Sequence, residues 1–524
     1  MELFDVIIVG SGPSAVSALK ALKDKKVLIL DVGMVTNDSG DSLNKSLRNL
    51  KKGNEIKFSD VIGDKFESLN NIHQEYMSPK IKAPLMRFVS NKFNELNKFK
   101  TTNFFVLGSF AKGGLSNAWG GGSMRYTEED LKDFPLSYSQ LEKHYDYLTN
   151  EIGISGENDD LKVEFLEDKN LLPPPELNFL AIDLLTQYKR LKAKFIELKF
   201  SIGFPRSAFI TAAKGSREVY KYDSMEFFKP YTNSIYNAKL FLENIVKEKS
   251  NVTYLDKKMV VSFVETDGSV EVKTIDITSG DEVNFTAQKL IIGAGCIGTS
   301  KIVLKSFNDF EAELPMLDNL VTYIPFVNFK FIGKKEDQRI IPPQLILMAE
   351  DERNKYLCSM YKLNNTLSGD YLMDFPLSVK GNIKAVKYLV PSILIMQVFY
   401  PDYQKKKNYL KLLNDGSVEI KYEDEEPRGN IEKKIIANFR RLGLHSMSFL
   451  VKKLRPGNSF HYSGTLPMKE KPGKFQTDSE CRLFGTKNVF IVDGSVFPVL
   501  PAKNNTFTIM ANAMRVGELV GKSL

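Results

Sequence analysis

The chain has 524 residues, and 43% of them are hydrophobic, so it can form two or three domains with a core in each. Its 72 Lys and Arg residues outnumber its 64 Asp and Glu residues, for a net charge of +8. This excess is spread along the chain, which argues against nucleic-acid binding. The three cysteines, Cys296, Cys358 and Cys481, lie far apart in no disulfide or metal-ligand spacing. We therefore expect a globular cytoplasmic protein with reduced thiols and no metal site.

The first elements of the chain predict a dinucleotide site. Residues 4–31 read as a buried strand, a Gly-rich turn, an Ala-rich helix and a second buried strand that ends in an acid. Gly10 permits the tight turn, Gly12 lets a pyrophosphate approach the backbone, and Ala15 lets the helix pack close to the strand. Asp31 stands where a carboxylate accepts hydrogen bonds from the adenosine ribose and repels a 2′-phosphate. The spacing does not choose between NAD and FAD.

A second Gly-rich loop, "AKGGLSNAWGGGSMR", surrounds Trp119, the only tryptophan of the chain. Its five glycines indicate several positions of positive φ or of close backbone approach, as expected of a loop that follows a cofactor. A plain cluster of turns with Trp119 as a packing anchor explains the same residues. The sequence alone leaves both interpretations open.

No membrane-spanning segment is expected. The longest apolar run, residues 388–400, is shorter than the roughly 20 residues that a bilayer requires, and the chain opens on a strand instead of a signal peptide. Just before this run, Lys380, Lys384 and Lys387 recur at helical spacing. They predict a surface helix with solvated lysines, and peripheral contact with anionic lipid is the alternative.

The C-terminal segment predicts a strand that ends at Asp493 and Gly494, followed by a Pro-containing loop and an apolar helix. Asn504, Asn505 and Thr506 precede that helix and are expected to cap it, and its free N–H groups can stabilise negative charge. Upstream, His461 precedes a Ser-Gly-Thr turn. A single histidine of this kind is more often structural than catalytic.

Five motifs together resemble the glucose-methanol-choline (GMC) oxidoreductases, and most of all the branch that contains pyranose oxidase and related sugar dehydrogenases. They are "VIIVGSGPSA", "GGLSNAW", "KLIIGAGCIGTSKIVLKS", "HYSGT" and "NVFIVDGSVFP…NNTFTIMANAMR". The resemblance covers roughly residues 1–34, 101–150, 230–305 and 455–524. It does not extend to residues 35–100 or to most of residues 306–455, which are the parts that would identify the substrate.

The resemblance implies an α/β fold in which a Rossmann-like FAD-binding domain is interleaved with an α+β substrate-binding domain built on an antiparallel or mixed sheet. The FAD-binding domain would comprise residues 1–34, 101–150, 215–305 and 456–524. The substrate-binding domain, with lid or insert segments, would comprise residues 35–100, 151–214 and 306–455. Within the last segment, "YLKLLNDGSVEIKYE" predicts a hairpin of the substrate sheet, with Asp415 and Gly416 at its turn.

The resemblance also implies roles for individual residues around the cofactor. Gly10, Gly12, Ala15 and Asp31 would hold the ADP half, and Gly113, Gly114, Ser116 and Asn117 would line the flavin. Gly293 and Gly295 would form the turn after a central strand. Asp493 and Gly494 would bind the ribityl-pyrophosphate region, and Thr506 would lie under the flavin ring. Some relatives bond FAD covalently through a histidine at the position of Ala118. We therefore expect non-covalent FAD.

In the family, the position three residues before the Gly-Thr pair holds the active-site histidine, and His461 occupies it. Its usual partner position corresponds to Asn504. An imidazole can take the proton of an alcohol, whereas an amide can only donate a hydrogen bond to the developing alkoxide. The other histidines, His73, His144 and His445, are expected to be structural.

We therefore expect FAD-dependent oxidation of an alcohol group on a sugar or related polyol, with dioxygen, a quinone or a protein as electron acceptor. Three alternatives stay open at this point. They are a lyase in which the flavin has no redox role, a catalytically silent binding protein, and a dehydrogenase for a lipid-linked sugar at the membrane surface.

Overall fold

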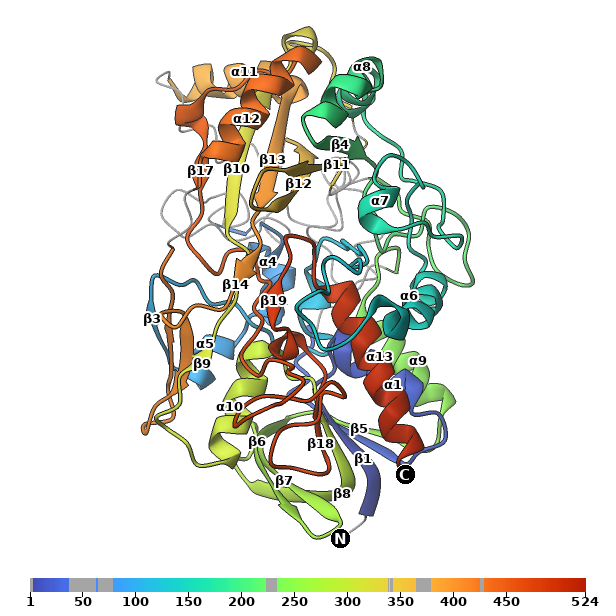
Figure 1. The fold of residues 1–524 in the computed structure, drawn as a ribbon, viewed down its shortest axis with the longest axis vertical. Coiled ribbons are helices and arrows are strands. Elements are labelled where there is room, and N and C mark those ends of the chain that lie inside the picture. The colour runs from blue at the N-terminus through green and yellow to red at the C-terminus, as the bar shows by residue number, and fades with distance from the viewer. Residues whose placement is uncertain are drawn as a thin grey trace.

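The computed structural model describes residues 3–36, 63–64, 79–222, 233–337, 339, 343–363, 378–424 and 428–524, so His73 lies outside the described residues. Two sheets organise the molecule, with loops and the helix α13 (Thr506–Lys522) between them (Figure 1). The lower half in that view carries a seven-stranded sheet, and the upper half carries a six-stranded one.

The lower sheet has the order β5-β2-β1-β8-β7-β6, with β18 also paired to β8. Its strands are β1 (Leu3–Val9), β2 (Val27–Leu30), β5 (Val252–Leu255), β6 (Lys258–Thr266), β7 (Ser269–Asp276), β8 (Glu282–Ile292) and β18 (Val489–Ile491). The strand β1 pairs parallel with β2 and with β8, and these in turn pair parallel with β5 and with β18. The strands β6, β7 and β8 form an antiparallel meander. Val6, Ile7 and Ile8 are fully buried, as expected of a central parallel strand.

Small residues allow helices to pack tightly on this sheet. The helix α1 (Pro13–Ala21) lies against α13, and a β-carbon at Gly517 would collide with the carbonyl oxygen of Ala18. Beside this pair lie α6 (Tyr138–Ile152) and α9 (Ala238–Glu248), whereas α10 (Cys296–Ser306) lies apart from them against β6 (Figure 1). The start of α1, the start of α10 and the start of α13 are thereby brought together.

The upper sheet has the order β17-β10-β13-β12-β11-β4, and every neighbouring pair is antiparallel. Its strands are β4 (Phe200–Gly203), β10 (Val321–Val327), β11 (Leu345–Glu350), β12 (Lys355–Lys362), β13 (Ile393–Phe399) and β17 (Lys452–Lys453). One face is covered by α8 (Phe179–Glu197) and α12 (Asn430–Phe439), where Phe439 packs between Phe195 and Phe326. The opposite face carries Phe399, which stacks on His461.

The predicted hairpin exists, but its assignment to the substrate sheet is wrong. Strands β15 (Tyr409–Leu412) and β16 (Val418–Lys421) pair antiparallel, with Gly416 at a φ of 77° in the turn. They belong to a separate sheet of order β3-β16-β15-β9, which includes β3 (Phe99–Thr102) and β9 (Leu314–Pro315). The parallel pairing of β16 with β3 joins segments far apart in sequence, so no local pattern could indicate it.

The remaining elements are short. They are α4 (Pro79–Lys82), η2 (Pro84–Val89), α5 (Phe93–Asn97), η3 (Gly114–Asn117), α7 (Lys162–Phe165), η5 (Phe329–Phe331), α11 (Val379–Leu389), η7 (Val390–Ser392), β14 (Asp402–Tyr403), η8 (Arg440–Leu442), η9 (Ser448–Leu450), η10 (Gly494–Val496) and β19 (Val499–Leu500).

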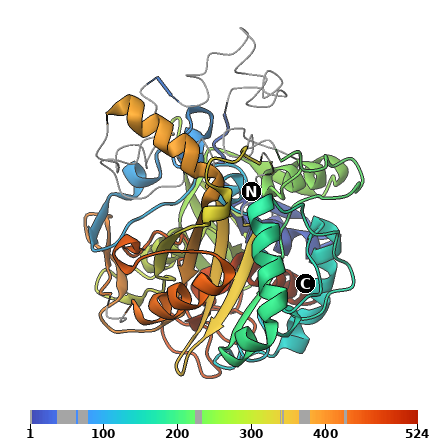
Figure 2. The same cartoon turned by 90° about the horizontal axis from the view of Figure 1, so that it is seen from above.

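Seen from above, α11 lies at the periphery (Figure 2), and Lys380, Lys384 and Lys387 on it are exposed. Contact of these lysines with lipid stays a hypothesis. No helix in the described ranges combines the length and hydrophobicity that crossing a membrane requires.

The two sheets take their strands from interleaved segments of the sequence. Every strand of the lower sheet comes from residues 1–34, 215–305 or 456–524, and every strand of the upper sheet comes from residues 151–214 or 306–455. The strand β3 crosses the expected boundary between residues 100 and 101. The chain therefore returns to the lower sheet after building the upper one.

Candidate active site

A cavity of about 440 Å³ lies where the starts of α1, α10 and α13 converge. Ten of the thirteen residues expected around the cofactor line it: Gly10, Gly12, Asp31, Gly114, Ser116, Gly293, Gly295, Asp493, Gly494 and Thr506. The other three, Ala15, Gly113 and Asn117, are absent from its lining. Ten of the expected residues therefore share one cavity, and each of the other three is next in sequence to a residue that lines it.

The turn between β1 and α1 leaves room for a phosphate group. Gly10 has a φ of 94°, and a β-carbon there would lie 2.6 Å from the carbonyl oxygen of Gly293. Gly12 differs, because a β-carbon on it would meet no atom within 4 Å and would enter the cavity. Gly10 thus serves the packing of two turns, whereas Gly12 leaves a cradle open at the start of a helix.

Asp31 is held at the end of β2 by two hydroxyl groups. Its Oδ2 accepts hydrogen bonds from Ser11 Oγ and, at 3.1 Å, from Tyr254 OH. Burial raises the pKa of Asp31 to about 6, and these hydrogen bonds oppose that shift. The carboxylate also accepts from the backbone N–H groups of Val32 and Gly33, and it borders the cavity, where it can meet hydroxyl donors such as those of a ribose.

The second Gly-rich loop folds onto the first. The N–H of Gly113 donates to Ser11 Oγ at 2.9 Å, and a β-carbon at Gly114 would lie 3.4 Å from the Cα of Gly12. Ser116 borders the cavity, while Asn117 donates to the carbonyl oxygens of the loop and accepts from Asn237. The loop therefore follows the cavity, with Asn117 as its internal support.

The C-terminal elements close the cavity. The carboxylate of Asp493 is buried and accepts from Ser495 Oγ and Thr299 Oγ1, so it joins the end of β18 to α10. Burial raises its pKa. The expected cap of α13 is absent, because Asn505 instead donates its amide to Ser463 Oγ at 3.1 Å. The first turn of α13, with Thr506 in the lining, thus starts at the cavity without a side-chain cap.

His461 and Asn504 meet beside this cavity. Asn504 Nδ2 lies 3.3 Å from His461 Nε2, and the neighbours Phe460, Tyr462 and Asn505 all line the cavity. Burial lowers the pKa of His461 to about 4, so the imidazole is neutral at neutral pH. A neutral imidazole and an amide N–H directed at one point can accept a proton from a hydroxyl group and hydrogen-bond to the oxygen left behind.

The other described histidines lie elsewhere. His144 is buried on α6, where burial lowers its pKa to about 4 and its Nε2 is 3.6 Å from Glu518. His445 pairs with Val327 through the backbone and stacks on Phe329. Neither lines the cavity.

Three neighbours of the His461–Asn504 pair were not expected at this site, although Gly122 belongs to the Gly-rich loop for which the sequence indicated close backbone approach. Asn319 Oδ1 lies 2.8 Å from His461 Nδ1, and the ring of Phe399 stacks on the imidazole with centroids 5.4 Å apart. A β-carbon on Gly122 would lie 2.7 Å from Asn504 Oδ1. Each contact joins segments far apart in sequence, so only the folded chain reveals them.

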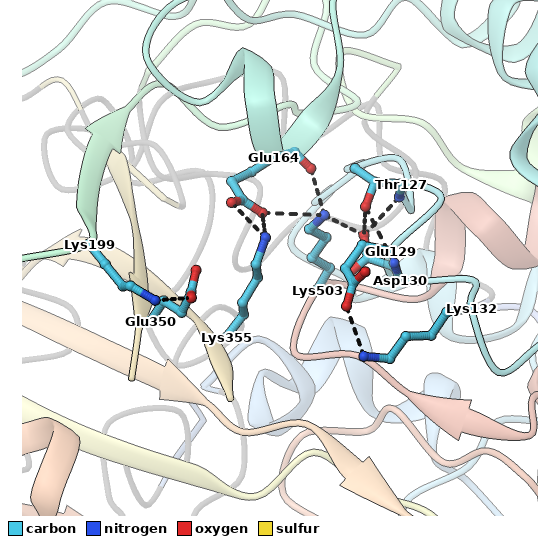
Figure 3. A network of polar contacts seen from close by, with 9 residues as sticks. All are labelled: Thr127, Glu129, Asp130, Lys132, Glu164, Lys199, Glu350, Lys355 and Lys503. Atoms are coloured by element: carbon cyan, nitrogen blue, oxygen red, sulfur yellow. Dashed lines mark hydrogen bonds and ion pairs between the residues drawn. The ribbon is translucent and has the colours of Figure 1, made fainter. Parts of the chain in front are cut away.

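A buried charge network supports the segment that carries Asn504 (Figure 3). Lys503 Nζ lies 2.5 Å from Asp130 Oδ2 and 2.5 Å from the carbonyl oxygen of Glu164. The Asp130 carboxylate also accepts from Thr127, and the Glu164 carboxylate pairs with Lys355 at the start of β12. Lys503 is 2% exposed. The network therefore fixes the start of α13 relative to the upper sheet.

Comparison with known proteins agrees with this geometry. Residues 415–513 match the family model described as GMC oxidoreductase, and the match includes His461, Asp493 and Asn504. The resemblance to the GMC family is confirmed by this match, which contains two of the five motifs, "HYSGT" and most of the closing one.

The whole chain shares its fold with a solved enzyme structure. The crystal structure of pyridoxine 4-oxidase from Mesorbium loti matches with a TM-score of 0.59, and the match covers 98% of this chain and 99% of that chain. Sequence identity is 12%, so the similarity concerns the fold. The expected pairing of a Rossmann-like domain with a second, sheet-based domain is confirmed. No curated protein matches the sequence.

Proposed function

We propose that this protein binds FAD non-covalently and oxidises an alcohol group of a sugar or related neutral polyol. The observation that carries the proposal is the approach of Asn504 Nδ2 to within 3.3 Å of His461 Nε2, beside a cavity framed by two Gly-rich turns and a helix start. FAD in that cavity supplies the acceptor for the hydride that leaves the substrate carbon.

The cavity residues fit the cofactor group by group. Gly12 offers an open backbone cradle for the pyrophosphate, and Asp31 offers a carboxylate oxygen for ribose hydroxyls. The first turn of α13 offers N–H groups where a flavin ring gains negative charge. Ala118 has no atom that can form a covalent link, so acid precipitation should release all the flavin into the supernatant. Flavin in the pellet would contradict non-covalent binding.

His461 and Asn504 would divide the work on the hydroxyl group. With its pKa at about 4, His461 is a neutral base that takes the hydroxyl proton at Nε2. Asn504 donates Nδ2–H to the oxygen as negative charge develops on it. The stacked ring of Phe399 holds the imidazole plane and keeps water from one of its faces.

Side chains of the upper sheet favour a substrate that is rich in hydroxyl groups. On β13, Gln397 shares a face with Phe399, because side chains alternate along a strand. In the register, Gln397 lies directly opposite Tyr323 of β10 and Ser359 of β12. This row of amide and hydroxyl groups lies about 7 Å along the strand from the residue that stacks on His461. These three groups suit the hydroxyl groups of a sugar, and the row ends at Lys452 of β17, which lies opposite Tyr323.

An anaerobic panel of alcohols, read at the flavin absorbance band, tests the proposal. Sugars and polyols should bleach the band, because only redox turnover reduces the ring. Pyridoxine belongs in the panel as an aromatic alcohol, since the structurally similar oxidase is named for it. Cleavage of a substrate with a fully oxidised flavin would instead identify a lyase, and a flavin that no alcohol reduces would contradict the proposed function.

A single substitution tests the finer assignment of the substrate. Gln397→Leu removes one donor and one acceptor from the row opposite Tyr323 and Ser359. The Kd of a sugar, obtained from the concentration dependence of flavin reduction, should rise roughly tenfold, the equivalent of about one hydrogen bond. The Kd of a simple alcohol with one hydroxyl group should not change. Equal effects on both substrates would contradict the role of this row.

A further inference from the structure

The two nitrogens of the His461 ring have different partners, and these partners decide which nitrogen can act as a base. Nδ1 lies 2.8 Å from Asn319 Oδ1, and Nε2 lies 3.3 Å from Asn504 Nδ2. A neutral imidazole carries one proton, so one of these nitrogens donates and the other accepts. The orientation of the two amides therefore determines the tautomer.

The amide of Asn319 can be oriented without reference to His461. Its Nδ2 donates to the backbone carbonyl oxygen of Tyr400 at 2.7 Å and to that of Pro501 at 3.1 Å. A flipped amide would place Oδ1 against two carbonyl oxygens, which have no proton to share. Asn319 is fully buried, so an unpaired amide would also lack water to compensate it. Oδ1 therefore faces Nδ1 of His461 and requires a proton there.

The amide of Asn504, which faces the second ring nitrogen, indicates the same tautomer of His461. Its Nδ2 is the atom directed at Nε2, while its Oδ1 lies toward Gly122. An N–H group pointing at Nε2 requires a lone pair on that nitrogen. With the proton on Nε2 instead, two lone pairs would face each other at Nδ1 and two N–H groups would face each other at Nε2.

We infer that Asn319 is a positioning residue that holds His461 in the Nδ1–H tautomer, which leaves Nε2, here facing Asn504 Nδ2, unprotonated and able to accept the proton of a substrate hydroxyl. This inference rests on the proposed function only for the identity of the substrate group. The tautomer itself follows from the contacts of three side chains. Asn319 joins the end of β13, through Tyr400, and the loop before α13, through Pro501, to the catalytic ring.

A neutral partner at Nδ1 has a different effect from a carboxylate. The polar and aromatic partners of the ring in the described part of the chain, Asn319, Asn504 and Phe399, carry no charge. Asp318 accepts from Ser459 Oγ and from the N–H of Gly457, and Ser459 Oγ accepts the backbone N–H of His461, so Asp318 makes no hydrogen bond to the ring. Asp402 accepts the backbone N–H of Asp318, and the hydroxyl group of Tyr422 contacts both Asp402 and the carbonyl oxygen of Asp318. The imidazolium thus gains no carboxylate at Nδ1, and the ring stays neutral while its tautomer is fixed.

Nuclear magnetic resonance of the FAD-loaded protein with ¹⁵N-labelled histidine tests the tautomer directly. The chain has four histidines, and His461→Gln identifies the signals of His461. At neutral pH, Nδ1 should resonate in the region of protonated imidazole nitrogens and Nε2 in the region of unprotonated ones. A wild-type spectrum with the proton on Nε2 overturns the inference, whatever the substrate proves to be.

Substitutions separate the positioning role from a structural one. Asn319→Leu should mix the two tautomers and slow anaerobic flavin reduction about tenfold or more, since a wrong tautomer removes the base. Asn319→Asp should keep the proton on Nδ1 and move the pH profile of flavin reduction upward, because a carboxylate stabilises the imidazolium. The matched control is Asn328→Leu, which removes another buried amide next to β10 without touching His461.

The outcomes also separate this inference from the proposed function. If no alcohol reduces the flavin, the proposed function fails while the wild-type spectrum still decides the tautomer. If the flavin is reduced, an Asn319→Asp protein with an unshifted pH profile contradicts the role of Asn319. The same conclusion follows if Asn319→Leu leaves the histidine spectrum unchanged.

Discussion

Gly122 and Asn504 approach so closely that a β-carbon on Gly122 would lie 2.7 Å from the amide oxygen of Asn504. Gly122 belongs to the loop after Trp119, and Asn504 immediately precedes Asn505 and α13. The φ of Gly122 is outside the left-handed region, so a glycine is required there for space and not for backbone conformation. The second Gly-rich loop therefore lies against the proposed catalytic pair as well as along the cavity proposed for the cofactor.

Gly122→Ala should displace the Asn504 amide from His461 and slow substrate-dependent flavin reduction roughly tenfold, because one hydrogen bond to the developing charge is weakened. The FAD content should be unchanged, since Gly122 does not line the cavity. Rapid mixing under anaerobic conditions measures the rate. Gly120→Ala is the matched control, because its β-carbon would meet no atom within 4 Å. Equal rates for the two variants would contradict this role of Gly122.

Gly12→Val and Gly10→Ala should fail in different ways. The Gly12 side chain would extend into the cavity without touching protein, so the variant should fold but bind FAD poorly and be colourless. The Gly10 side chain would meet the carbonyl oxygen of Gly293 at 2.6 Å in a strained backbone, so that variant should misfold. Circular dichroism and flavin absorbance distinguish the two results. A yellow, active Gly12→Val protein would show that Gly12 does not face the pyrophosphate.

Lys503→Met should lower the melting temperature and slow flavin reduction. It removes a buried cation from between Asp130 and Glu164 and leaves the Asp130 carboxylate without its charge partner, a loss of about 3 kcal/mol. The displaced neighbour is Asn504, so the rate should fall with the stability. Lys132→Met serves as control, because the pair of Lys132 with Glu129 is exposed and contributes about 1 kcal/mol at most (Figure 3). Comparable losses in both variants would contradict the importance of the buried network.

Local patterns in the sequence predicted the elements that adjoin the cofactor cavity. The strand, glycine turn and helix of residues 3–21 follow from an apolar run, two glycines and a Pro-initiated, Ala-rich segment. Asp31 follows the second strand, and the hairpin turns at Gly416, as those residues indicate. These features depend on neighbours in sequence, which a single sequence displays.

The contacts around His461 could not be predicted in this way. Asn319 Oδ1 lies 2.8 Å from a ring 142 positions later in the chain, and its own amide is oriented by carbonyl groups of two further segments. The hairpin was assigned to the wrong sheet for the same reason, since its partner β3 lies more than 300 residues earlier. The expected cap of α13 is absent, since the oxygen of the Asn505 side chain accepts no N–H of the helix and its amide donates to Ser463.

His461 should give a pH dependence that reflects its low pKa. A base acts when it is unprotonated, and burial lowers the pKa of His461 to about 4, so the neutral form predominates at higher pH. The rate constant for flavin reduction should therefore be level between about pH 5.5 and 8 and fall tenfold per unit below about pH 4. A decline centred near 6.5, the ordinary value for histidine, would show that the folded protein leaves the imidazole solvated.

His461→Ala should keep the fold and the bound FAD, because its side chain contacts Asn319, Asn504 and Phe399 and does not line the cavity. Flavin reduction should slow by roughly two to four orders of magnitude, the scale of a positioned general base. Asn504→Ala should lose less, because His461 would still accept the proton and only one hydrogen bond to the oxygen would disappear. A purely structural His461 predicts the reverse pattern, with a lower melting temperature, partial loss of flavin and a normal rate in the folded fraction. Rapid-mixing reduction of flavin-loaded variants decides between the two, and a His461→Ala protein reduced at the wild-type rate would remove the basis for a catalytic role.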